Sequence, residues 1–211
     1  MPESKPSYMN LLILFLSNTS YFRIVEYYVG SIDNYNVDHL YDILDMWTDG
    51  FCLYGNYKFA EHLMMHGVTV YQYILSYVGP NTFSNVWANG VDRASHADDL
   101  IYLWNFSHPL ARNIQLRGDD IPVKDIMTQA WADFATFGNP TPPGSKFSWT
   151  PLENTSYFTF WNISGPNPAM AHSDYIQERM ELWENTLDDG NSNAVPKQLI
   201  VWLILLILIA L

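Results

Sequence analysis

Cysteine is nearly absent from this sequence, and basic residues are few. Cys52 is the single cysteine, so the chain cannot form an internal disulfide, which on its own favours a reducing compartment. Lys and Arg number 10 against 22 Asp and Glu, for a formal net charge of −12. Negative charge repels a phosphate backbone, and no basic stretch interleaved with aromatics offsets it. The composition therefore argues against a nucleic-acid partner.

What the chain has in abundance is apolar and aromatic surface. Hydrophobic residues make up 48% of its 211 residues and aromatic residues 16%. Such a composition is far too apolar for a disordered chain, and a chain of this length can bury a substantial core. We therefore expect a globular fold without internal repeats.

Four N-x-S/T sequons oppose the reducing compartment that the cysteine usage suggests. Each sequon alone is weak evidence, but four in a short acidic chain favour secretion and an extracellular location. The candidate glycosylation sites are Asn18, Asn105, Asn154 and Asn162.

Both ends of the chain carry apolar segments. Residues 1–20 contain LLILFLS behind a near-neutral flank, which favours a buried strand over a weak signal peptide. Residues 199–211 form an unbroken apolar run, about 20 Å long as a helix and so shorter than the ~30 Å hydrocarbon core. With the polar spacer at 188–198, this end resembles a GPI-attachment signal, with a membrane helix as the alternative. The lipid-anchor candidates are Gly190, Asn191 and Ser192.

Between these ends, helical and strand patterns alternate, which predicts an α/β layer fold. The expected elements are two helices within 36–66 with a break near Gly50 and Gly55, a strand at 68–78 buried on both faces, a short segment at 98–105, an amphipathic helix at 123–137 that ends at Gly138-Asn139-Pro140, a strand at 156–164 and a final helix at 172–187. Asn36 or Asp38 is the expected cap of the first helix.

Three motifs in consistent order resemble the C-terminal part of the type-B carboxylesterase/cholinesterase family. They are VYQYILSY followed by SHADDLIYLW, WADFATFGNPTPPG followed by FSWTPLE, and ERMELWENTL. The resemblance covers residues 21–187 and implies the C-terminal portion of an α/β-hydrolase fold. That portion is an incomplete, mostly parallel sheet with flanking helices.

The resemblance places His96 at the family's catalytic histidine. A serine esterase needs a neutral imidazole that removes the hydroxyl proton and returns it to the leaving alcohol. Asp98 and Asp99 follow on the same tight loop, so we expect them to support the loop, because the family's triad acid is a distant upstream carboxylate. The His62–His66 pair lacks the glutamate of an HExxH site, and neither a metal nor a cofactor is expected.

The departures from the family pattern are as informative as the motifs that match it. The sequence contains no G-x-S-x-G, no HGGG-type loop and no Glu-Gly dipeptide, so the nucleophile, oxyanion loop and triad acid are missing. We therefore expect a fragment: the C-terminal portion of a secreted or membrane-anchored carboxylic ester hydrolase that supplies the triad histidine and is inactive alone. Its substrates would be small-molecule carboxylic esters. The alternative is a non-catalytic cholinesterase-like adhesion or receptor protein at the cell surface.

Overall fold

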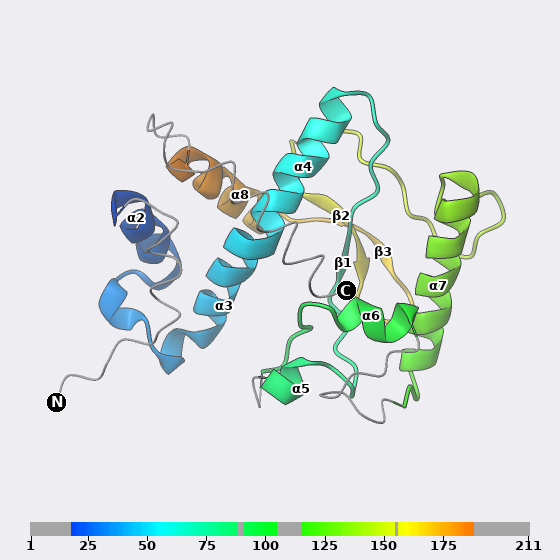
Figure 1. Ribbon diagram of the computed structural model, residues 1–211, viewed down its shortest axis with the longest axis horizontal. Helices are drawn as coiled ribbons and strands as arrows, with labels where there is room; N and C mark the ends of the chain where they lie inside the picture. The colour runs from blue at the N-terminus through cyan, green and yellow to red at the C-terminus, as the bar shows by residue number, and fades with distance from the viewer. Residues whose placement is uncertain (1–17, 88–90, 105–114, 155, 188–211) are drawn as a thin grey trace. The chain divides into compact units, whose positions relative to one another are not determined.

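The computed structural model describes residues 18–87, 91–104, 115–154 and 156–187 (Figure 1). These residues divide into two compact units. The helical unit comprises the described residues up to Met65 and those from Asp174 onward, and the sheet unit runs from His66 to Ser173.

The helical unit contains four α-helices and two short 3-10 helices. Its elements are α2 (Asn18–Val29), η1 (Ile32–Asn34), η2 (Val37–His39), α3 (Leu40–Thr48), α4 (Tyr54–Met65) and α8 (Asp174–Leu187). Its core is formed by the buried side chains of Ile24, Val25, Met46, Met180 and Trp183. Asn36, one of the two expected caps, caps the 3-10 turn η2 that leads into α3, because its side chain accepts the Asp38 N–H at 2.9 Å.

The sequence correctly predicts two helices that meet near Gly50, but the chain does not leave the helical conformation there or at Gly55. A π-helical turn, η3 (Asp49–Leu53), joins α3 to α4, and the three run as one rod in Figure 1. Gly50 instead permits close packing, because a Cβ there would lie 2.6 Å from the tip of the Trp183 indole. The glycine makes room for a side chain from α8 and does not end the helix.

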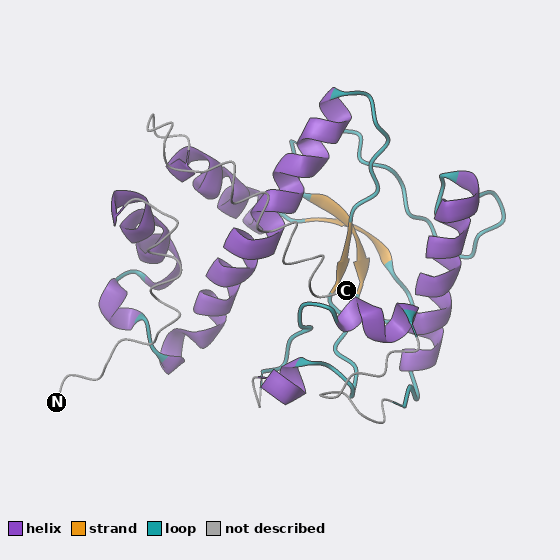
Figure 2. Cartoon of the chain, in the orientation of Figure 1, coloured by secondary structure: helices purple, strands orange, loops and turns teal. Residues whose placement is uncertain are grey.

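The sheet unit holds a three-stranded sheet of order β1-β2-β3 (Figure 2). Its strands are β1 (Tyr73–Leu75), β2 (Thr159–Ile163) and β3 (Ala169–His172), and its helices are α5 (Ser84–Trp87), α6 (Asp98–Leu103) and α7 (Asp120–Phe137). β1 runs parallel to β2, and β3 runs antiparallel to it. Each strand pairing is short, so the sheet depends on the helices that cover it.

The strand expected at 68–78 is shorter and more exposed than the sequence predicts. Only Tyr73–Leu75 is a strand, and its three residues are half-buried. Within the described ranges, β1 pairs with β2 alone, so it is an edge strand. A strand that is buried on both faces needs a packed layer on each side of the sheet, and the described residues do not bury β1 in this way.

Helices α6 and α7 pack on one face of the sheet. Val123 and Met127 of α7 are fully buried against Trp161 and Ile163 of β2. Helix α7 ends at Gly138, whose left-handed φ of +66° lets its N–H bond the Phe134 carbonyl at 2.8 Å, as the sequence predicts. The core of the sheet unit therefore lies between α6, α7 and the sheet.

The two apolar ends of the chain lie largely outside the described residues. This applies to residues 1–17 and to the whole of 188–211, including the anchor candidates Gly190, Asn191 and Ser192. Among the residues that the structure describes, no helix is both long enough and apolar enough to cross a membrane.

Candidate active site

His96 lies in a two-residue turn directly before α6, and its side chain is exposed. The next residue, Ala97, has a φ of +70°, the left-handed region that costs a non-glycine residue roughly 1 kcal/mol. A residue keeps such a conformation only where its surroundings impose it. The turn that carries His96 is therefore held by specific contacts.

Asp98 makes those contacts and is almost fully buried, with 2% of its surface exposed. Its Oδ2 accepts the Thr82 hydroxyl at 2.6 Å and the Ser95 N–H at 2.8 Å, and its Oδ1 accepts the Phe83 N–H at 2.8 Å. One carboxylate thus joins the segment before α5 to the loop that carries His96.

Asp99 links the same helix to the sheet. Its Oδ2 accepts the Tyr73 hydroxyl at 2.8 Å, and its Oδ1 accepts the N–H of Leu100 at 3.1 Å. Burial, and then the negative charge of Asp99, raise the pKa of Tyr73 well above its usual range, so the phenol remains a donor. The bond ties the start of α6 to β1.

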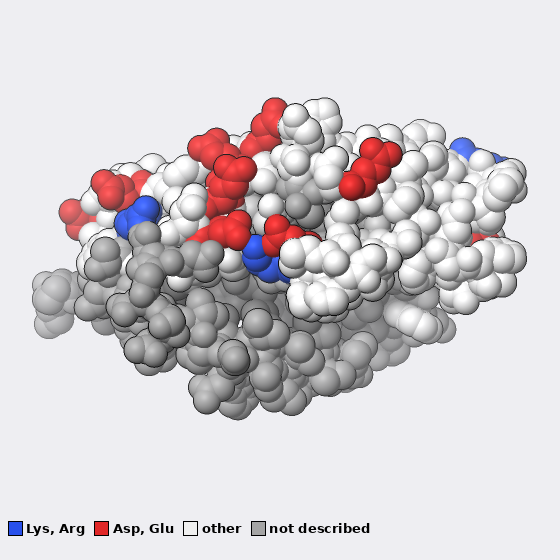
Figure 3. Space-filling model, turned by 90° about the horizontal axis from the view of Figure 1, so that it is seen from above, with Lys and Arg blue, Asp and Glu red and all other residues white. Residues whose placement is uncertain are grey.

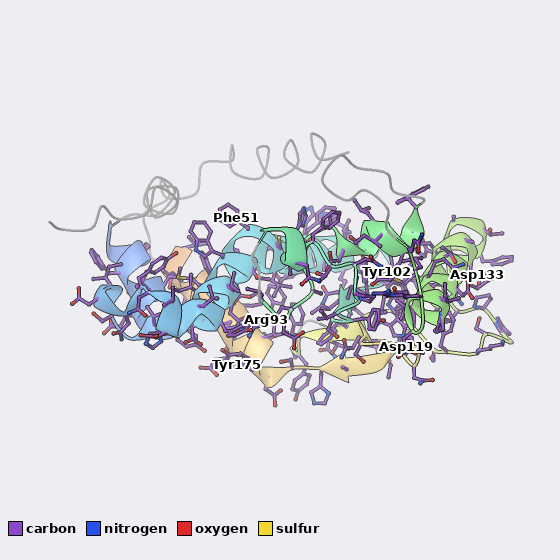
Figure 4. The ribbon with its side chains drawn as sticks, turned by 90° about the horizontal axis from the view of Figure 1, so that it is seen from below. Phe51, Arg93, Tyr102, Asp119, Asp133 and Tyr175 are labelled. Carbon is purple, nitrogen blue, oxygen red and sulfur yellow. The ribbon has the colours of Figure 1, made fainter. Side chains whose placement is uncertain are left out.

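A third carboxylate, Asp120, was not anticipated from the sequence. It is fully buried at the start of α7, where Oδ1 accepts the hydroxyls of Tyr77 (3.2 Å) and Tyr102 (3.4 Å) and Oδ2 accepts the Arg117 N–H (3.1 Å). Tyr102 belongs to α6, and its side chain is buried (Figure 4). Burial and the charge of Asp120 raise the pKa of Tyr77 to about 12. The one sequence signal was the acidic pair Asp119-Asp120, which is separated by one residue from Pro122 at the helix start.

The imidazole of His96 has no hydrogen-bond or ion-pair partner within the described ranges. Asp98 and Asp99 lie next to it in sequence, yet both carboxylates bind other groups. The two aspartates therefore hold the loop and the start of α6 in place, and the histidine ring is left exposed. The arrangement presents a proton acceptor and, among the described residues, no nucleophile bonded to it.

The described residues offer no group of three or more His, Cys, Asp or Glu side chains that could hold a metal ion. His62 lies on α4 and His66 directly follows it. Cys52 is half-buried in η3, and burial raises the pKa of its thiol. In the part of the face that Figure 3 colours, most acidic side chains lie at the left and in the middle of the view, with a few basic ones among them.

The sequons fall in different environments. Asn154 is exposed in a loop, whereas Asn162 lies within β2. Asn18 is the first residue of α2, and Asn105 lies outside the described residues.

The helical unit contains a separate buried ion pair. Asp49 is fully buried, and its Oδ2 lies 2.8 Å from Nε of Arg179, whose Nη1 contacts Asp45 at 2.9 Å. Tyr28 donates to Asp49, and the Trp183 indole donates to Tyr28 at 3.1 Å. Burial raises the pKa of Asp49 to about 6, against the opposing effects of the Tyr28 bond and the Arg179 charge.

Comparison with known proteins gives consistent matches. A model of the carboxylesterase family matches residues 10–183. The juvenile hormone esterase of Tribolium castaneum is 27% identical over 140 residues, which are 62% of this chain and 23% of that protein. The chain thus spans about a quarter of the length of this curated relative.

Two solved structures resemble the chain in fold. One is juvenile hormone esterase from Manduca sexta with OTFP covalently attached, at a TM-score of 0.62 and 20% identity over 83% of this chain and 34% of that one. The other is the Geobacillus stearothermophilus carboxylesterase EST55 at pH 6.2, at a TM-score of 0.55 and 20% identity over 76% of this chain and 31% of that one.

Proposed function

Because this chain belongs to the carboxylesterase family and has part of an α/β-hydrolase fold, we propose that it is the C-terminal portion of a carboxylic ester hydrolase with His96 as general base. One observation carries the proposal. The His96 ring is exposed on a loop whose two neighbouring carboxylates are already engaged elsewhere. A general base needs this combination of a fixed backbone and an available ring nitrogen.

In ester hydrolysis, a neutral imidazole takes the proton of a serine hydroxyl as the oxygen attacks the carbonyl carbon. The resulting imidazolium then returns that proton to the leaving alcohol. Asp98 and Asp99 fix the loop and act as positioning residues that do not touch the substrate. The serine, the oxyanion donors and the triad acid would come from a segment outside this sequence, which contains no G-x-S-x-G and no Glu-Gly.

The proposed substrates are small-molecule carboxylic esters with an apolar acyl or alcohol part. We also propose an extracellular, cell-surface-anchored location, supported by the four sequons and the apolar run at 199–211. The rival proposal of a non-catalytic adhesion or receptor protein is favoured by the missing nucleophile motif. It is opposed by His96, which such a protein has no chemical need to keep.

The decisive experiment is complementation. The full chain is fused behind the N-terminal part of a carboxylesterase that contains G-x-S-x-G, and hydrolysis of p-nitrophenyl butyrate is measured. We expect background activity from the chain alone and hydrolysis from the fusion, with His96→Ala lowering kcat by about 10⁴-fold or more. His66→Ala is the matched control, because it removes another exposed histidine.

A folded fusion with no activity would favour the adhesion alternative. Activity of the fusion that survives His96→Ala would remove His96 from the mechanism. The transcript offers an independent check, since an in-frame G-x-S-x-G upstream of Met1 would supply the missing nucleophile.

A further inference from the structure

The sequons at Asn154 and Asn162 lie in sharply different surroundings within the sheet unit. We propose that Asn154, and not Asn162, carries an N-linked oligosaccharide in the folded protein. This inference goes beyond ester hydrolysis and rests on the proposed extracellular location.

Asn154 lies in an exposed loop that has a backbone hydrogen bond on each side. Before it, the Leu152 N–H donates to the Val70 carbonyl at 2.8 Å, and after it, the carbonyl of Phe158 accepts the Ser173 N–H at 3.0 Å. Between these hydrogen bonds, the side chains of Glu153, Asn154, Ser156 and Tyr157 are all exposed. Asn154 and Ser156 are therefore presented to solvent between two backbone hydrogen bonds.

The hydrogen bonding of Asn154 leaves its reactive atom available. Its Oδ1 accepts the Ser156 N–H at 3.0 Å, while Nδ2 donates to no residue within the described ranges. The two ends of the sequon are thus already turned toward each other. The amide nitrogen, which would form the glycosidic bond, points to no protein acceptor there.

The transfer reaction balances with one co-substrate, a lipid-pyrophosphate-linked oligosaccharide. Nδ2 of Asn154 forms a bond to the anomeric carbon of the first sugar, and the bond from that carbon to the pyrophosphate oxygen breaks. The lipid pyrophosphate leaves with the electron pair, and Nδ2 loses one proton, which is released to water. Nothing is oxidised or reduced.

Asn162 differs from Asn154 in its backbone surroundings and in its burial. It lies in β2, the middle strand, opposite Ile74 of β1 and Ala169 of β3. Its side chain is half-buried, and its Oδ1 accepts the Ser76 hydroxyl at 2.5 Å. Side chains on neighbouring strands lie only about 5 Å apart, so a glycan here would have to leave the sheet between side chains of both flanking strands. Acceptor asparagines belong in surface loops.

The test is glycopeptide mass spectrometry on the full chain, secreted from insect cells behind a heterologous signal peptide. Two matched variants, Ser156→Ala and Ser164→Ala, each remove the hydroxyl of one sequon and leave its asparagine in place. We expect glycan on Asn154, loss of that glycan and faster gel migration for Ser156→Ala, and no change for Ser164→Ala.

An unmodified Asn154 in the secreted chain, or an oligosaccharide on Asn162, would overturn the inference. The heterologous signal separates this result from the question of natural location. The chain with its own N-terminus, expressed in parallel, addresses location. If the chain with its own N-terminus carries no glycan while the signal-peptide form is glycosylated, the extracellular proposal is contradicted. The choice of Asn154 over Asn162 is unaffected by that result.

Discussion

Replacing Asp98 by Ala should destabilise the sheet unit more than any substitution on the exposed part of the same loop. The carboxylate is buried and accepts three hydrogen bonds, from Thr82, Phe83 and Ser95. Alanine leaves two backbone N–H groups without their acceptor, and a hydrogen bond to a charged group is worth about 1.5–3 kcal/mol. Because the three bonds share one carboxylate, their losses do not add fully, and we expect about 3–5 kcal/mol.

A loss of that size is a large part of the stability of a small domain, about 5–15 kcal/mol. Asp98→Asn is therefore the milder companion. It keeps the shape of the side chain, but its NH₂ group must face the N–H of either Phe83 or Ser95, and about 2 kcal/mol should be lost. Urea unfolding gives the free energies, and amide hydrogen exchange resolved to residues 82–98 locates the effect. Exchange should accelerate at Phe83 and Ser95, whose N–H groups bond the carboxylate.

The control is Asp92→Ala, which removes an exposed aspartate earlier in the same loop. An exposed substitution without special contacts changes stability by about 0.5 kcal/mol or less. If Asp98→Ala and Asp92→Ala unfold at the same urea concentration, the three hydrogen bonds do not hold the loop. The positioning role assigned to Asp98 would then fail, whatever the role of His96.

Two further predictions concern the helical unit. The pKa of Asp49 is raised from 3.8 to about 6, so the folded state holds a proton that the unfolded state releases between these values, and stability should fall as pH rises from about 4 to 6. The fall is up to about 3 kcal/mol, and calorimetry of Asp49→Asn should show that dependence removed; an unchanged pH profile would exclude Asp49 as its source. Gly50→Ala should cost about 1–3 kcal/mol in a thermal melt because its Cβ meets Trp183, whereas Gly55→Ala, with nothing within 4 Å, should stabilise the helix by roughly 0.5–1 kcal/mol. Equal effects of the two would contradict the packing argument.

The sequence predicted best those elements whose signal is local. Helix α7 follows a 3.6-residue pattern over several turns and ends at a glycine, so both its face and its end were predicted correctly. Strand β2 and helix α8 were also found, with bounds shifted by a few residues. The family resemblance drawn from three motifs is confirmed by the family match over 10–183.

The errors arise where a distant residue decides the structure. Gly50 was interpreted as a helix break, because nothing near it in sequence reveals the Trp183 indole that fills its space. Strand β3 and helix α2 were missed: β3 is four residues long, and α2 follows an apolar run that favoured a strand. The strand at 68–78 was extended too far, since burial on both faces depends on neighbours that a single segment does not reveal.

The candidate site also combines a feature with a local sequence signal and features that depend on distant residues. His96 was selected as the candidate base through a motif, and its exposure follows from its place in a turn. What holds that turn is tertiary, because Asp98 reaches back to Thr82 and Phe83, and Asp99 reaches to Tyr73 on the sheet. A catalytic histidine needs a fixed backbone as much as it needs a free ring nitrogen. The left-handed Ala97 shows that the loop is held against its own local preference, so the carboxylates of Asp98 and Asp99, and not the histidine, determine where the imidazole lies.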